Sequence, residues 1–331
     1  MLEEKDTNKM FNVAVIATMS AGKSTVLNAL LGEELLPSMN IACTAKVFKL
    51  NDVDGLSQFS GRIKYKDGCW SKFASVDTKI LYDWNSKNIT EVEIQGDFPH
   101  INNLSHGRKI SFYDTPGPNN SVDKTHSEIF ETIIDASDYS FVLFIMNATQ
   151  FGVDDEKSLL KKLLDKLNST DKNHKIIFVL NKIDCLDFEM EETPVALMRR
   201  VKAYLLEIGF PSPVIIPSFA KLSLDIRTVL NAYAKQGKSD MSVRQQKRFA
   251  RDFNSFKENS EHYFDIHLYD NRLHSSLQNA LEQKRNGMGF NDINIGEGTY
   301  TSNDLLWGDL ATGIPLIEEF LEIEMNRYFD N

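Results

Sequence analysis

A glycine-lysine-serine turn between an apolar strand and a helix constrains this chain more than any other feature. Residues 12–17 (Asn-Val-Ala-Val-Ile-Ala) have the continuous apolar pattern of a buried strand, and residues 23–31 have the pattern of a helix that Gly32 ends. The run between them, Ala17-Thr-Met-Ser-Ala-Gly-Lys-Ser-Thr25, matches the phosphate-binding pattern G-x-x-x-x-G-K-[ST], except that alanine replaces the first glycine. The sequence therefore predicts a nucleotide-phosphate site at the end of this strand.

The residue types of this loop indicate how it would hold phosphate. Backbone N–H groups at a helix N-terminus attract anions, so the loop amides would cradle the phosphates. Lys23 would reach the β and γ phosphates, and the Ser24 hydroxyl would be a ligand of Mg²⁺. A positive φ at Ala17 would cost about 1 kcal/mol. The predicted cofactor-binding residues of the loop are Met19, Ser20, Ala21, Gly22, Lys23, Ser24 and Thr25.

Apolar strands and helical patterns alternate along much of the chain. Continuous apolar runs predict strands at 141–146, 176–180 and 214–216, and helical patterns cover 154–167 and 194–208. Apolar strands separated by helices are typical of a parallel sheet covered on both faces. We therefore expect a P-loop NTPase three-layer α/β fold with a mostly parallel central sheet.

Two regions depart from this alternation. Shorter and more polar segments predict antiparallel edge strands at 45–50, 61–66, 90–94 and 109–113. Residues 221–281 are helical and charged, residues 283–301 are expected to form a mobile loop, and a last helix is expected to begin near Gly313-Ile-Pro315. We expect an N-terminal segment at 1–11 and one domain at 12–331, with a helical insertion and loop at 221–300.

Composition excludes several classes of protein. The chain has 331 residues and a formal net charge of −10, which gives no bulk attraction to nucleic acid. No apolar run reaches the roughly 18 residues of a membrane-spanning helix, and the N-terminus lacks a signal-peptide core. Its 3 cysteines are too few for a disulfide framework. We expect a cytoplasmic protein that can also lie at the periphery of a membrane. We expect no nucleic-acid partner.

Further segments bear on the metal and the γ-phosphate. Asp114-Thr-Pro-Gly117 follows a predicted strand, so Asp114 can hold Mg²⁺ through water and the Gly117 N–H can touch the γ-phosphate. A threonine that closes over Mg²⁺ is also needed, and Thr44 is the first choice. Thr78 and Thr90 are rivals by composition that lie too deep in the antiparallel region.

Base selection is predicted from two later segments. Asn181-Lys182-Ile-Asp184 follows an apolar strand, and the carboxylate of Asp184 can accept two N–H bonds from the guanine edge, which adenine does not offer. After residues 214–216, the loop that ends at Lys221 is expected to offer a backbone N–H to guanine O6. Ala220 is the first choice for this N–H and Ser218 the second.

Taken together, these motifs resemble the GTPase domain of dynamin-like proteins, especially bacterial ones. The resemblance is carried by Ser20–Ser24, Leu27–Gly32, Leu35-Leu-Pro37, Thr44, the two motifs at 114–117 and 181–184, and Gly313–Phe320. It implies GTP hydrolysis, Mg²⁺, and dimerisation of GTPase domains across the nucleotide. It also implies that Ser20 helps to place a charge-compensating monovalent cation.

Two residues depart from that family's pattern. Met19 stands where dynamins typically carry a glutamine that helps to hold the attacking water, and Pro118, after Gly117, has no side-chain donor. Water would then be placed by the backbone at Thr44 and Gly117, or by a partner. We expect slow intrinsic turnover that rises with protein concentration. The helical bundles through which the family touches lipid lie outside this sequence, so membrane contact is expected only through such regions.

Two other functions remain open. One is a GTP-gated module that recruits a partner with negligible hydrolysis, which Met19, Pro118 and Ala17 favour. The other is a small GTPase of the ribosome-assembly type, which the acidic net charge disfavours because it would need a basic RNA-binding appendage.

Overall fold

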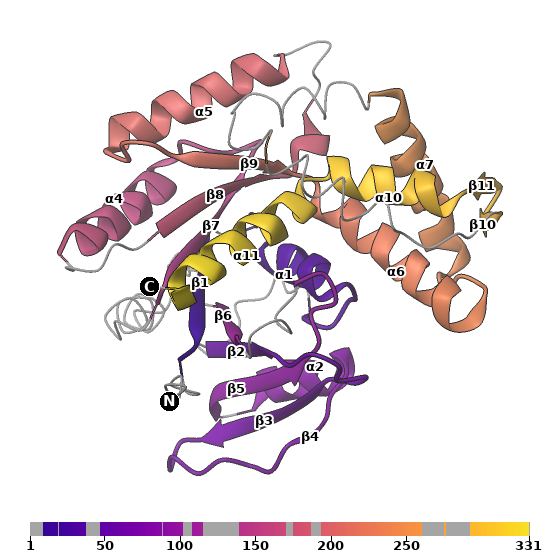
Figure 1. Ribbon diagram of the computed structural model, residues 1–331, viewed down its shortest axis with the longest axis horizontal. Helices are drawn as coiled ribbons and strands as arrows, with labels where there is room; N and C mark the ends of the chain where they lie inside the picture. The colour runs from indigo at the N-terminus through magenta and orange to yellow at the C-terminus, as the bar shows by residue number, and fades with distance from the viewer. Residues whose placement is uncertain are drawn as a thin grey trace, which may run out of the picture.

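A computed structural model describes residues 9–18, 20–37, 47–87, 89–101, 108–114, 139–169, 175–186, 193–259, 275 and 292–330. Within these residues a nine-stranded sheet has the order β4-β3-β5-β2-β6-β1-β7-β8-β9. Helices cover both faces of its parallel half, and β2 to β5 extend the sheet away from them (Figure 1). The predicted fold class is therefore confirmed.

The parallel half holds the phosphate-loop strand at its centre. β1 pairs in parallel with β6 on one side and β7 on the other, and β7, β8 and β9 continue in parallel. These strands are apolar on both faces because helices cover both. Their bounds are β1 (Phe11–Ala17), β6 (Ile110–Asp114), β7 (Phe141–Asn147), β8 (Lys175–Asn181) and β9 (Val214–Ser218).

The other half of the sheet is mixed, which corrects part of the sequence prediction. Segment 109–113 was expected to be an antiparallel edge strand, but β6 lies inside the sheet, parallel to β1 and antiparallel to β2. The segment at 90–94 is parallel to β2, although it is antiparallel to β3. Only the short β4 lies at that edge, and the bounds are β2 (Val47–Asp52), β3 (Ser60–Tyr65), β4 (Ala74–Ser75) and β5 (Ile89–Gly96).

A helix that the sequence analysis missed precedes β5. This helix, α2 (Thr78–Ser86), begins after Asp77, whose side chain accepts a hydrogen bond from the Ile80 N–H. An aspartate in this position is a common helix N-cap, because its carboxylate satisfies an N–H that has no partner within the helix. The cap was therefore a usable signal.

Alternate residues of β1 face two separate cores, as a strand between two helical layers requires. Val13 and Val15 pack in the cluster that includes α1 and α11, whereas Ala14 and Ile16 pack in the cluster that includes α4 and α5. α6 contributes residues to both clusters and lies against α1. The helices are α1 (Lys23–Leu31), α4 (Asp154–Ser169), α5 (Pro194–Ile208), α6 (Ala220–Gln236), α7 (Val243–Glu258), α10 (Ser302–Ala311) and α11 (Ile314–Asp330).

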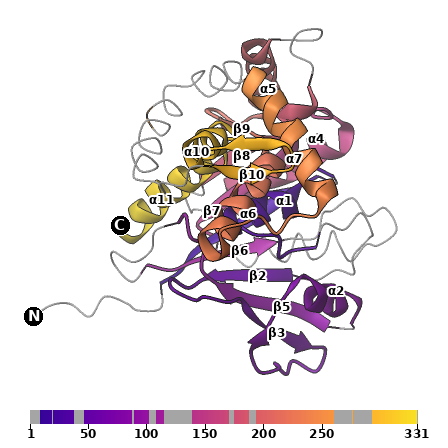
Figure 2. The ribbon, with the colours of Figure 1, turned by 90° about the vertical axis from the view of Figure 1, so that its right-hand side faces the viewer.

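The C-terminal part contains one more difference from the sequence prediction. Residues 283–301 were expected to be a mobile loop, but a hairpin forms from β10 (Ile293–Ile295) and β11 (Gly298–Tyr300). The hairpin lies beside α7 (Figure 2), where the Tyr300 ring meets Phe249 and Phe253 edge-on. The last helix begins at Ile314, as predicted. The division of the chain at 221–300 stays a prediction.

The helices of the described residues also bear on membrane crossing. None of them combines the length and the apolar composition that a transmembrane helix needs.

Candidate functional site

The loop after β1 has the backbone that the phosphate pattern requires. Gly22 is the N-cap of α1, with φ 91°, in the left-handed region that favours glycine. A Cβ at this position would lie 2.4 Å from Asn181 Nδ2, so glycine is needed for space as well as for conformation. Ala17 belongs to β1 and has no positive φ, so the strain considered for its methyl group is absent.

The phosphate lysine and the predicted metal aspartate lie together. Lys23 at the start of α1 forms an ion pair with Asp114 at the end of β6, and both side chains are largely buried. They meet because β6 pairs with β1, with Asp114 opposite Val15. Ser24 follows in the first turn of α1. A hydroxyl and a carboxylate are the hard oxygen donors that suit Mg²⁺, so the residues present fit this ion.

Asn181 joins the phosphate loop to the predicted base-recognition segments. It is buried at the end of β8, where its Nδ2 donates to the Ala21 carbonyl oxygen at 2.9 Å. Its Oδ1 accepts a hydrogen bond from the Ala220 N–H, the first residue of α6, at 3.2 Å. One amide side chain therefore connects loop, strand and helix, and it brings together segments about 160 residues apart in the chain.

Asp184 lies beyond Asn181 in a short 3₁₀ helix, η1 (Ile183–Cys185), and its side chain reaches the surface. Neighbouring atoms nevertheless displace enough water to raise the pKa of Asp184, the negative charge of Asp252 on α7 adds to this, and Lys182 opposes it. The Cys185 thiol donates to Asp184 Oδ2 at 3.5 Å. The role of Asp184 in accepting N–H bonds from guanine stays a prediction.

The segment after β9 lies at the same edge of the sheet. Ser218 is buried, and its hydroxyl has no hydrogen-bond partner within the described part of the chain. Ala220 gives its N–H to Asn181, and the Lys221 ammonium pairs with Asp225 one turn further along α6. The contacts of Ser218, Ala220 and Lys221 with a base stay predictions.

Some predicted site residues cannot be placed. Met19, Thr44 and Gly117 lie outside the described residues, and so does Pro118. The two rival threonines are described. Thr78 begins α2 and donates its hydroxyl to the Glu34 carbonyl oxygen, whereas Thr90 in β5 donates to that of Lys64.

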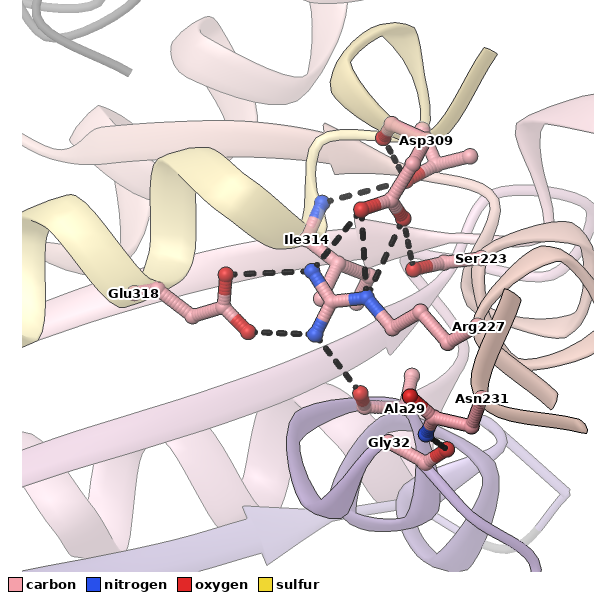
Figure 3. A network of polar contacts seen from close by, with 9 residues as sticks. Ala29, Gly32, Ser223, Arg227, Asn231, Asp309, Ile314 and Glu318 are labelled. Atoms are coloured by element: carbon pink, nitrogen blue, oxygen red, sulfur yellow. Dashed lines mark hydrogen bonds and ion pairs between the residues drawn. The ribbon is translucent and has the colours of Figure 1, made fainter. Parts of the chain in front are cut away.

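A buried polar network that sequence reasoning missed holds the far end of α1. Arg227 of α6 donates to the Ala29 carbonyl oxygen at 2.8 Å and pairs with Asp309 of α10 and Glu318 of α11 (Figure 3). We call these four residues the inner network. On the same side, Asn231 Nδ2 donates to the Gly32 carbonyl oxygen at 3.0 Å. No local sequence signal could reveal Arg227, because its partners are 82 and 91 residues away.

This geometry defines the class of protein. A left-handed glycine at the start of α1, a lysine paired with the aspartate of the adjacent strand, and an Asn-Lys-Ile-Asp segment at the same sheet edge are the parts of a P-loop GTPase domain. The Dynamin family model matches residues 13–183, and the chain belongs to the dynamin family as a dynamin-like GTPase domain.

Individual relatives are distant. The chain is 25% identical over 316 residues to Dynamin-like protein 1 of Campylobacter jejuni, which covers 85% of this chain and 42% of that protein. It is 26% identical over 234 residues to an uncharacterized protein in the xynA 3' region of Caldicellulosiruptor, covering 68% and 52%. The chain thus spans about half the length of these curated relatives, or less.

Solved structures give a weaker likeness. A structure described as an oligomerised bacterial dynamin pair matches with a TM-score of 0.49 and 21% identity, over 85% of this chain and 43% of that one. Era in complex with a GTP analogue and ribosomal RNA matches with a TM-score of 0.38 and 18% identity, over 69% and 56%.

Proposed function

We propose that this domain binds GTP with Mg²⁺ and hydrolyses it, and that self-association of GTPase domains accelerates the reaction. The observation that supports this most is the position of Asn181, which links the phosphate loop to both base-recognition segments. Such a link supports a single nucleotide whose phosphates and base would be held by these neighbouring segments. Family membership supports guanine-nucleotide binding in general.

On the phosphate side, Lys23 would exchange Asp114 for the β and γ phosphates, and the loop amides would stabilise charge as it develops. Ser24, Thr44 and Asp114 would hold Mg²⁺, which when bound would supply further positive charge beside the phosphates. Ser20 would help to place a monovalent cation. Thr44 and Gly117 would position the attacking water through their backbones.

Hydrolysis is tested by phosphate release from GTP over a wide range of protein concentration. We expect slow release at low concentration and a rate per molecule that rises with concentration. Lys23→Ala should abolish release, because the β and γ phosphates then lose the side-chain cation that would meet them, whereas Arg199→Ala on the exposed face of α5 is the matched control and should change nothing. Fast release that does not depend on concentration would overturn activation by self-association.

Guanine selection is proposed for Asn181, Lys182 and Asp184. Asp184→Asn should weaken binding of GTP relative to xanthosine triphosphate, because an amide can donate to the xanthine oxygen but cannot accept two N–H bonds. The test is competition between the two nucleotides for the wild-type protein and for the variant. Unchanged discrimination would remove Asp184 from this role.

A second candidate is a GTP-gated module that recruits a partner and hardly hydrolyses GTP. Met19 and Pro118 favour it, since neither side chain can orient water. Tight GTP binding with no phosphate release at any protein concentration would select this candidate.

A further inference from the structure

A second charged cluster on α6 lies beside the predicted base site. Asp225 Oδ1 accepts a hydrogen bond from the Lys221 ammonium at 2.5 Å, and both carboxylate oxygens of Asp225 lie 3.4 Å from Arg248 Nη2 on α7. We call Lys221, Asp225 and Arg248 the outer cluster. Lys221 comes directly after Ala220, whose N–H reaches Asn181, so the cluster begins where the predicted base-recognition segments meet.

The burial of these three side chains is unequal. The Asp225 side chain is only 8% exposed, whereas those of Lys221 and Arg248 are 39% and 40% exposed. A buried carboxylate needs cationic partners, but a half-exposed lysine can point its ammonium into water. The two cations therefore compensate the buried charge of Asp225, and the same pairing holds the lysine in one place.

α7 supports this arrangement and also approaches the base motif. Its first turn is fixed by a capping box between Ser242 and Gln245, and Phe249, next to Arg248, is buried. One turn further on, the charge of Asp252 acts on Asp184. Helix α7 thus places Arg248 beside Asp225, which holds Lys221, and it places the negative charge of Asp252 near Asp184.

We propose that Asp225 is a positioning residue for guanine recognition, which holds the Lys221 side chain in place beside the predicted base site while Arg248 fixes Asp225. This inference rests on the proposed function. A lysine released from Asp225 would turn its ammonium toward water or toward Glu34, the other carboxylate whose charge acts on Asp225, and its carbon chain would move with it. With the ammonium held by Asp225, the carbon chain of Lys221 remains available to pack against the base.

A double-mutant cycle on nucleotide affinity tests the proposal. The four proteins are wild type, Asp225→Asn, Lys221→Met and the double variant, and the probe is a fluorescent GDP analogue. We expect Asp225→Asn to weaken GDP about 10-fold, which corresponds to about 1.4 kcal/mol. In the Lys221→Met background the same substitution should have no further effect, because no ammonium is left to misplace. Asp225→Glu should recover part of the affinity.

The outcomes separate this proposal from the proposed function. If wild type does not prefer GDP over ADP, both fail together. The positioning role alone is overturned if wild type prefers GDP and Asp225→Asn binds GDP equally well. It is also overturned if Asp225→Asn weakens GDP binding as much in the Lys221→Met background as in wild type. If Asp225→Asn does not fold, Arg248→Gln replaces it in the test. This variant should weaken the affinity for GDP 2- to 3-fold in the wild-type background only, an effect of roughly half a kcal/mol. Arg244→Gln on the exposed face of α7 is the matched control.

Discussion

The two charged clusters on α6 use similar residues under opposite conditions. In the inner network Arg227 is 1% exposed and its partners Asp309 and Glu318 are 1% and 5% exposed, so every charge has left water. In the outer cluster only Asp225 is buried, and both cations keep contact with solvent. The inner charges pair with one another out of contact with water, whereas the half-exposed outer cations could pair elsewhere. From this difference we expect the inner network to matter for stability, and the proposed positioning role would make the outer cluster matter for nucleotide selection.

The inner network also completes the end of the phosphate-loop helix. The last carbonyl groups of a helix lack partners within the helix. Arg227 meets the carbonyl oxygen of Ala29, and Asn231 meets that of Gly32 (Figure 3). Helix α1, which begins after Gly22, is thus held at its far end by two side chains of α6, and one of them, Arg227, is paired in turn with α10 and α11.

Arg227→Met should have the largest effect on stability. It removes the guanidinium that pairs with the buried carboxylates of Asp309 and Glu318, and breaking a buried ion pair typically costs about 3–5 kcal/mol. Chemical denaturation with urea measures the change. We expect the midpoint to fall sharply, or the variant to be unfolded at room temperature.

The matched control is Arg244→Met on α7, which changes the same side chain at an exposed position. It should change the free energy of unfolding by no more than about 0.5 kcal/mol. A loss below about 1 kcal/mol for Arg227→Met would contradict the comparison, because it would mean that the inner carboxylates reach water or protons without difficulty.

Gly22→Ala should have the second largest effect on stability, because it disturbs Asn181, which contacts the N-terminal end of α6. A left-handed backbone costs a residue with a Cβ about 1–2 kcal/mol. The methyl group would in addition push the Asn181 amide away from the Ala21 carbonyl oxygen, a further ~1 kcal/mol. Gly237→Ala is a close control, since Gly237 ends α6 with φ 69° and open space around it. Equal losses of stability for both variants would remove the packing argument at Gly22.

Much of the parallel half of the sheet could be predicted because its signals are local. The apolar runs at 141–146 and 176–180 each lie within a strand. The residues from Ala17 to Lys23 indicate the end of a strand, a tight turn and the start of a helix. The mixed half could not be ordered in this way. Strand direction depends on which strands pair, and the polar segment that became β6 carries no mark that its neighbour on one side would be β1.

The candidate site shows the same limit. Asn181 was predicted from its motif, but its bridge between Ala21 and Ala220 exists only in the folded chain. The spacing of Lys221 and Asp225 was a usable signal, because residues four apart on a helix are neighbours. Arg248 gave none, since its place beside Asp225 depends on how α7 packs on α6.

Asn231→Ala should have a smaller effect than Gly22→Ala. It removes one hydrogen bond to the Gly32 carbonyl oxygen, at a half-buried position that water can partly reach. We expect a loss of about 1 kcal/mol in urea denaturation, and no change in the discrimination between GDP and ADP. A change in that discrimination would contradict the separation of a stabilising inner network from a selective outer cluster.

Glu156→Gln should give the smallest change, and a gain instead of a loss. Glu156 in α4 is 1% exposed like the inner carboxylates, but within the described residues no lysine or arginine pairs with it. Burial raises its pKa above the ordinary 4.5, and the Gly152 N–H, which donates to Oε1 at 2.9 Å, opposes this only in part. Between the ordinary and the raised pKa the folded protein keeps a proton that the unfolded chain has lost, so wild-type stability falls as pH rises through this window. The neutral glutamine does not suffer this fall. Thermal unfolding should therefore find the variant more stable at pH 7 and equal to wild type below the ordinary pKa; a difference that does not depend on pH would show that Glu156 is not the group responsible.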